Sequence, residues 1–157
     1  IEIGPLTDAE IVDIVDAGFE RTGRSPGSAR EQIIKFVRGH PQRMMQMADA
    51  VWRHTEEGST AGLDTWERAL AAVRSSVDSG TERLYALLPT GQQKTLRAIV
   101  SGGSPYGTAA DVLELPAGTA TGAIESLTNL GYLIRKHDKL LVVDPLFADW
   151  IRRRFPV

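Results

Sequence analysis

The stretch that decides the fold is residues 132–143, which read Tyr-Leu-Ile-Arg-Lys-His-Asp-Lys-Leu-Leu-Val-Val. Two mainly apolar segments, 132–135 and 140–143, flank a polar tetrapeptide at 136–139. Short runs rich in β-branched and aromatic residues on either side of a polar turn are typical of a β-hairpin. Because the rest of the sequence has no comparable strand pattern, we expect one two-stranded hairpin in a mainly helical protein.

Three helices are expected to lead into this hairpin. One runs from Thr90 to Gly102, a short one follows the turn at 104–107, and the third begins at Thr119 and is closed by Gly131. Its apolar spacing predicts that the third helix buries Ile124, Leu127 and Leu130. A segment at 81–88, ended by Pro89, is expected to form a separate short helix before them.

A last helix follows the hairpin. Asp144 and Pro145 open it. It is expected to bury Leu146, Phe147, Trp150 and Ile151. A winged-helix domain has this order of elements: a helix, a short helix, a turn, a further helix and a two-stranded wing. We therefore assign residues 81–157 to a winged helix-turn-helix domain with a β wing and a C-terminal helix.

The first half of the chain predicts a bundle of four helices. Thr7 to Glu10 is a capping box, in which the two side chains satisfy free amides at a helix start. The first helix is expected to bury Ile11, Ile14, Val15 and Phe19. Later helices start near Ser28, at Pro41 and at Asp64. Three methionines follow Pro41 at positions 44, 45 and 47, so one of them should be exposed while the others pack in the core. Residues 1–80 are thus expected to form one helical domain.

Composition excludes several classes of function. The chain has 157 residues, a formal charge of −2 and no cysteine, so thiol chemistry and disulfides are absent. Residues 1–80 carry nine Lys and Arg against thirteen Asp and Glu, and residues 81–157 carry nine against seven. No apolar run approaches the about 20 residues of a membrane span, and no signal peptide opens the chain. We expect a cytoplasmic protein without a membrane partner.

Catalytic motifs are missing from the sequence. No segment matches the G-x-x-x-x-G-K-[ST] loop that cradles nucleotide phosphates, and no Gly-x-Ser-x-Gly elbow occurs. His40, His54 and His137 lack metal-ligand spacing. We expect residues 1–157 to be no enzyme and to hold no metal.

Three strings carry a resemblance to a known family. Residues 38–47 read Arg-Gly-His-Pro-Gln-Arg-Met-Met-Gln-Met, with a Gly-x-Pro at a helix start. Residues 5–10 and 143–152 precede the bundle and end the winged helix. Together, over essentially the whole chain, they resemble the lid and C-terminal winged helix of STAND-type and archaeal-type AAA ATPases. Residues 1–6 read as the end of a strand or linker, so we expect a fragment of a longer protein, with a processed mature chain as the alternative.

The resemblance implies a nucleotide-sensing role for Gly39, Pro41 and Arg43 in the parent protein. Gly39 and Pro41 would lie against ATP that an upstream core domain binds with Mg²⁺, and Arg43 would sense its phosphates; no cofactor is expected in the fragment itself. Helix N-termini and arginine side chains both suit anions. The alternative is structural: Gly39 ends one helix, Pro41 starts the next, and Arg43 is a solvated first-turn residue.

A winged helix also raises the question of DNA. The third helix presents Thr121 and Asn129 outward but no basic residue, and Glu125 would face phosphates. Arg135, Lys136 and Lys139 of the wing, with the arginines at 152–154, could contact a nucleic-acid backbone.

Three hypotheses follow. The first is a non-catalytic regulatory module whose lid closes on nucleotide and whose winged helix contacts the core domain, a protein partner or a second copy. The second is a DNA-binding regulator that uses the wing and the third helix. The third is a free-standing scaffold unrelated to ATPases.

Overall fold

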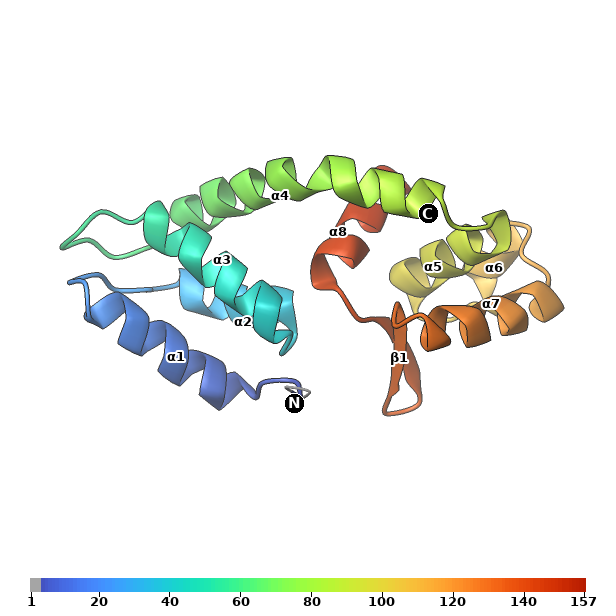
Figure 1. The fold of residues 1–157 in the computed structure, drawn as a ribbon, viewed down its shortest axis with the longest axis horizontal. Coiled ribbons are helices and arrows are strands. Elements are labelled where there is room, and N and C mark those ends of the chain that lie inside the picture. Colours follow the sequence, from blue (N-terminus) through green and yellow to red (C-terminus); the bar gives the residue numbers. More distant parts are fainter. Residues whose placement is uncertain (1–3) are drawn as a thin grey trace. The chain divides into compact units, whose positions relative to one another are not determined.

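The computed structural model describes residues 4–157, so residues 1–3 of the expected linker lie outside the described part. In chain order, its elements are α1 (Asp8–Glu20), α2 (Ala29–Val37), α3 (Pro41–Arg53), α4 (Leu63–Ala86), α5 (Thr90–Gly102), α6 (Thr108–Val112), α7 (Ala117–Asn129), β1 (Leu133–Lys136), β2 (Lys139–Val142) and α8 (Pro145–Arg154) (Figure 1). The fold is mainly helical with one small antiparallel sheet, as the sequence predicts. None of the described helices is both long and apolar enough to cross a bilayer.

The chain divides into two compact units between Val77 and Asp78, close to the boundary expected at residue 80. We call residues up to 77 the first unit and residues 78–157 the second unit. The division falls inside α4, which is one continuous helix. The separate helix expected at 81–88 is therefore wrong: polar, weakly helix-forming residues suggested a break, but the backbone stays helical through them.

The first unit consists of α1, α2, α3 and the first half of α4. The predicted capping box is confirmed: Glu10 N–H donates to Thr7 Oγ1 at 3.2 Å, and Thr7 N–H donates to Glu10 Oε2 at 3.0 Å. α1 buries Ile11, Val15 and Phe19, but Ile14 is 41% exposed, contrary to the prediction. The buried stripe is therefore narrower than four apolar positions suggested.

The methionine prediction is confirmed, since Met44 and Met47 are buried and Met45 is 57% exposed. α4 begins at Leu63, one residue before the predicted start, and its Thr65 hydroxyl accepts from Gly62 N–H at 3.2 Å. The side chains that α4 adds to the core of the first unit are Trp66, Ala69, Leu70 and Val73.

Two loops of the first unit are joined by backbone hydrogen bonds. Ser25 N–H donates to Ser59 O at 3.0 Å and Ala61 N–H donates to Ser25 O at 2.8 Å, which forms a single parallel bridge between Ser25 and Thr60. Gly27 lies so close to Ala61 O that any Cβ at residue 27 would overlap that oxygen. The loop after α1 and the loop after α3 therefore form one joined structure.

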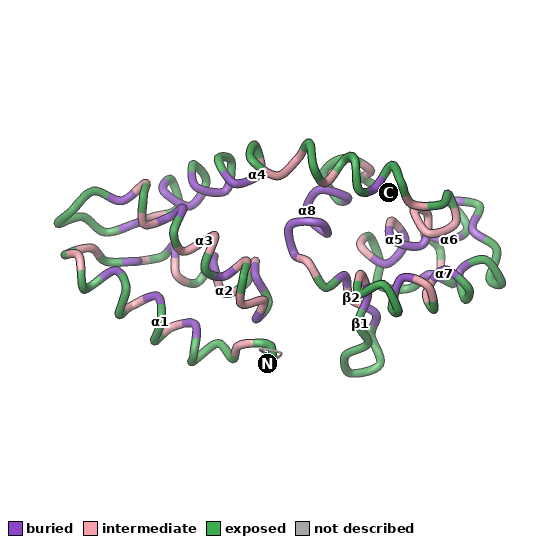
Figure 2. Tube along the Cα trace, viewed as in Figure 1, coloured by how far each residue is buried: buried purple, intermediate pink, exposed green. Residues whose placement is uncertain are grey.

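The second unit has a winged-helix-like arrangement. β1 and β2 pair antiparallel with Leu133 opposite Val142, which confirms the predicted hairpin. Lys136 and Lys139, expected in the turn, instead pair with each other as strand residues, so the turn contains only His137 and Asp138. The main core combines side chains from α4, α5, α7, the hairpin and α8; its buried members are Tyr85, Leu96, Ile99, Leu127, Leu133, Leu140, Val142, Phe147, Ala148, Trp150 and Ile151. A smaller cluster of three alanines and two leucines joins α5, α6, the connection after α6 and α7 (Figure 2).

The buried face of α7 consists mainly of alanines, not of the larger apolar side chains that the sequence suggested. It buries Ala120, Ala123 and Leu127, whereas Ile124 is half-buried and Leu130 is 65% exposed. The prediction of Leu130 as a core residue is wrong because α7 ends at Asn129 and the chain then turns into β1.

Candidate functional site

The first candidate region is the turn between α2 and α3, which contains Gly39 and Pro41. α2 ends with two successive left-handed residues, Arg38 (φ 46°) and Gly39 (φ 80°). Leu6 N–H donates to Gly39 O at 2.8 Å, and a Cβ on residue 39 would lie 2.7 Å from Leu6 O. A glycine is thus required both by the backbone angle and by the close approach of the segment that enters α1.

Pro41 occupies the first turn of α3, where its missing N–H removes no helical hydrogen bond. His40 is the N-cap: its Nδ1 accepts from Arg43 N–H at 3.2 Å, and its carbonyl accepts from Met44 N–H at 2.9 Å. Gln42 is the second residue of the helix, a position whose amide has no acceptor within the helix itself. An anion at this helix start would meet that amide and would compete with the His40 ring for Arg43 N–H.

Arg43 already has hydrogen-bonding partners. Its Nη1 donates to Gln46 Oε1 at 2.7 Å, and the side chain makes further interactions while remaining half-buried. The guanidinium is nevertheless at the start of α3, on the same turn as Gly39 and Pro41. Its contact with Gln46 is a hydrogen bond to a neutral acceptor, which is weaker than a forked contact to phosphate. The arrangement of the helix start and the guanidinium is compatible with anion recognition.

The groove beside this turn is unsuited to phosphate. A shallow hollow of about 500 Å³ lies along the entry segment and α1, lined by Gly4, Pro5, Leu6, Glu10, Asp13 and Ile14. Its charged side chains are both carboxylates, which repel anions. This hollow therefore offers no favourable surroundings for an anion.

The second candidate region is the exposed face of α7. Thr121, Glu125 and Asn129 were predicted to face outward. Thr121 and Asn129 are exposed, but Thr121 is occupied: its Oγ1 lies 2.8 Å from Tyr106 Oη and donates to Ala117 O at 3.0 Å. The sequence of α7 contains no basic residue. This face offers hydrogen-bonding groups but no charge that favours a nucleic-acid backbone.

The wing carries a cluster of three basic residues. Arg135 and Lys136 end β1, Lys139 begins β2, and all three are exposed. The turn between the strands places His137 (φ 49°) and Asp138 (φ 61°) in the left-handed region. Such a turn matches the twist of the strands but normally selects Asn and Gly.

The arginines at the end of α8 differ from the basic residues of the wing because two of them contact other side chains. Arg153 binds Asp78 through both terminal nitrogens, at 2.8 and 3.1 Å, and Asp149 through Nε at 2.9 Å. The hydrogen bond to Asp78 is the main cause that raises the pKa of Arg153. Arg154 stacks against the Phe155 ring at 5.3 Å, and Arg152 is exposed.

Gly39, Pro41 and Arg43 are thus brought together on one turn of the first unit. The five residues considered for nucleic acid are all exposed, on α7 and the wing of the second unit. Three features were missed by the sequence analysis: the cap by His40, the contact of Leu6 with Gly39, and the contact of Tyr106 with Thr121. A histidine directly before a helix-starting proline was the available signal for the first; the other two depend on contacts distant in sequence.

Comparison with family models and with curated proteins yields no match. Among solved structures, the chain is similar to a Walker-type ATPase of Pyrococcus abyssi, with a TM-score of 0.72 and 19% sequence identity. The similarity covers 94% of this chain and 42% of the ATPase chain. The two proteins share this part of their fold, and this chain spans less than half of the ATPase's length.

Proposed function

We propose that residues 1–157 are the non-catalytic lid and winged-helix module of a larger AAA- or STAND-like ATP-binding protein. The first unit closes on nucleotide held by an upstream P-loop domain, and the winged helix contacts that domain, a protein partner or a second copy. The observation that carries the proposal is the match of nearly the whole chain to less than half of a Walker-type ATPase.

The start of α3 supports this role. Gly39 lets the entry segment approach closely, Pro41 begins the helix, and Arg43 is on the same turn, with a side-chain hydrogen bond to the neutral acceptor Gln46. In the proposed complex, Arg43 exchanges the Gln46 carbonyl for a phosphate oxygen, and the Gln42 amide adds a second donor. Residues 39–43 contain no carboxylate, so the Mg²⁺ that accompanies ATP would be held by the core domain.

The test compares two arginines on one helix. In the parent polypeptide, Arg43→Ala should weaken ATP binding about tenfold or more, as expected when one charged hydrogen bond is removed. Arg53→Ala is the matched control, since Arg53 ends α3 and pairs with the exposed Asp49 at 2.8 Å. Affinity is measured by calorimetry.

Two results would contradict the proposal. One is ATP turnover by residues 1–157 alone. The other is equal ATP affinity of the Arg43 and Arg53 variants. The upstream coding sequence gives an independent check, because the proposal requires a P-loop about 150 to 250 residues before residue 1, at ordinary domain size.

A second candidate function is DNA binding through the wing, favoured by the exposure of Arg135, Lys136 and Lys139. Replacing all three by Ala should weaken binding and reduce the slope of log K against log salt by about 0.9 for each phosphate that is no longer neutralised. Gel shifts over a salt series measure this, with Glu125→Gln on α7 as a control that should bind no more weakly than wild type. Absence of any shift at low salt excludes this function.

A further inference from the structure

The middle of α4 is composed of weak helix formers. Residues 75–81 read Ser-Ser-Val-Asp-Ser-Gly-Thr, and each of these residue types ranks below Ala, Leu, Glu and Lys in helix propensity. Ser76 Oγ also donates to Val73 O at 2.8 Å, a local bond that competes with helical geometry. The sequence of this segment therefore does not by itself account for a continuous helix.

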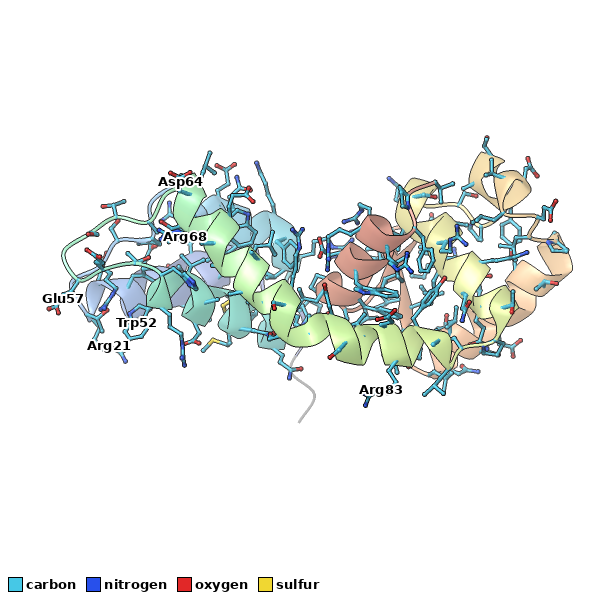
Figure 3. The ribbon with its side chains drawn as sticks, turned by 90° about the horizontal axis from the view of Figure 1, so that it is seen from above. Arg21, Trp52, Glu57, Asp64, Arg68 and Arg83 are labelled. Carbon is cyan, nitrogen blue, oxygen red and sulfur yellow. The ribbon has the colours of Figure 1, made fainter. Side chains whose placement is uncertain are left out.

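Tertiary packing contributes only partly to this helix, because Arg74, Val77, Asp78 and Thr81 are half-buried. Between Val73 in the first unit and Tyr85 in the second, a stretch that the structure describes in full, no residue of α4 is buried (Figure 2). Arg83 projects outward from the helix (Figure 3), and Leu84 is 40% exposed. Helices in water depend mainly on a buried face, and an isolated segment of this length is marginal.

An ion-pair network ties this segment to α8 within the second unit. Arg153 of α8 grips both carboxylate oxygens of Asp78, at 2.8 and 3.1 Å, while its Nε binds Asp149 at 2.9 Å. Asp149 is 5% exposed, so its side chain fixes where the guanidinium lies. The forked contact is the strong form of an arginine–carboxylate pair.

We propose that residues 74–84 form a conditional helix, whose order is set by the Asp78–Arg153 ion pair. When Arg153 holds Asp78, the two units are joined by a helix; when this ion pair breaks, the segment opens locally while both cores remain folded. This conformational switch goes beyond the nucleotide role proposed above and does not depend on it.

Hydrogen exchange followed by mass spectrometry tests the switch on the whole chain. Amides at 77–84 are expected to exchange about tenfold or more faster than those of α3 at 47–53, since opening leaves the core packing intact. Asp78→Asn should accelerate exchange at 77–84 about fivefold or more, because it removes a charged, forked interaction. Exchange in α5 should be unchanged.

Glu82→Gln is the matched control: it removes the same charge from an exposed position on the same helix. It should change exchange at 77–84 less than twofold. In the opposite direction, Ser79→Ala with Gly80→Ala should slow exchange, because both residues are exposed and a Cβ at residue 80 meets nothing within 4 Å.

The proposal is overturned if amides at 77–84 exchange as slowly as those of α3, or if the Asp78 and Glu82 variants behave alike. If Asp78→Asn accelerates exchange throughout α5 and α8 as well, the ion pair stabilises the whole second unit and the switch is likewise refuted.

Discussion

The turn before α3 and the tip of the wing share a backbone conformation, but the first is packed against neighbouring backbone and the second is exposed. Each places two consecutive residues in the left-handed region, Arg38 and Gly39 in the first turn and His137 and Asp138 in the second. At Gly39 the backbone of Leu6 leaves no room for a Cβ, whereas the wing tip is exposed throughout. The first turn is fixed by packing and the second is not.

The two turns therefore differ in whether packing explains their left-handed conformation. A left-handed glycine pressed against a neighbouring backbone has a structural reason to be there, so its conformation alone does not indicate a ligand. Left-handed His137 and Asp138 are exposed, so burial does not compensate for their strain. Packing therefore does not account for the left-handed conformation at the wing tip as it does at Gly39.

The largest expected effect is at the packed turn. Gly39→Ala should lower the free energy of unfolding by about 3 kcal/mol, combining the left-handed strain with overlap against Leu6 O. Gly58→Ala measures the left-handed strain alone, because Gly58 has φ 81° but open space where a Cβ would lie. It should lower the free energy of unfolding by about 1 kcal/mol. Urea unfolding monitored by fluorescence and circular dichroism measures both. Equal effects would show that the backbone around Leu6 relaxes without cost.

At the wing tip, substitution of the left-handed residues is expected to raise the free energy of unfolding. His137→Asn combined with Asp138→Gly should raise the stability of the second unit by about 1 kcal/mol, since these residues suit two positive φ angles. Thermal unfolding followed by circular dichroism gives the shift in Tm. A lower stability would mean that the native side chains make stabilising interactions at the tip.

A smaller effect is expected from charge across the hairpin. Lys136 is directly opposite Lys139, and like charges at facing positions destabilise a strand pair. Lys136→Glu should stabilise the second unit by about 0.5 kcal/mol at low salt and by less at high salt. Arg135→Glu is the control, because residue 135 faces Leu140, and it should gain less.

The smallest expected effect is on the pH dependence of the stability of the second unit, and it involves a core residue outside the wing. Burial raises the pKa of Tyr85 above its usual value, although Arg97 partly opposes this shift. The folded state therefore retains the phenol proton where the unfolded chain releases it, and this contribution to stability is lost as pH rises above about 10. Tyr85→Phe should flatten the fall of stability over that pH range in denaturant titrations; an unchanged slope would contradict it.

Local signals in the sequence predicted most of the fold. The Thr7–Glu10 capping box, the hairpin and the buried residues of α8 follow from short-range chemistry, and the structure contains each of them. The continuity of α4 was missed because the run from Ser75 to Thr81 has the composition of a break. Within this run, Asp78 binds Arg153, which is distant in sequence.

The candidate sites show the same limit. Helix periodicity identified the exposed face of α7 but not Tyr106, which reaches it from another part of the chain. The glycine and proline of the α3 turn could be recognised from local spacing, whereas the reason for Gly39 is its close approach to Leu6. Long-range interactions of this kind leave no periodic pattern in one sequence.

The bridge between Ser25 and Thr60 has a consequence for synthesis on the ribosome. All described buried side chains of the first unit lie at or before Val73, and the bridge partners at 59–61 precede α4. The nascent chain can therefore complete this bundle before the winged helix has left the ribosome. The exposed middle of α4 follows this bundle out of the ribosome, and the second unit folds last.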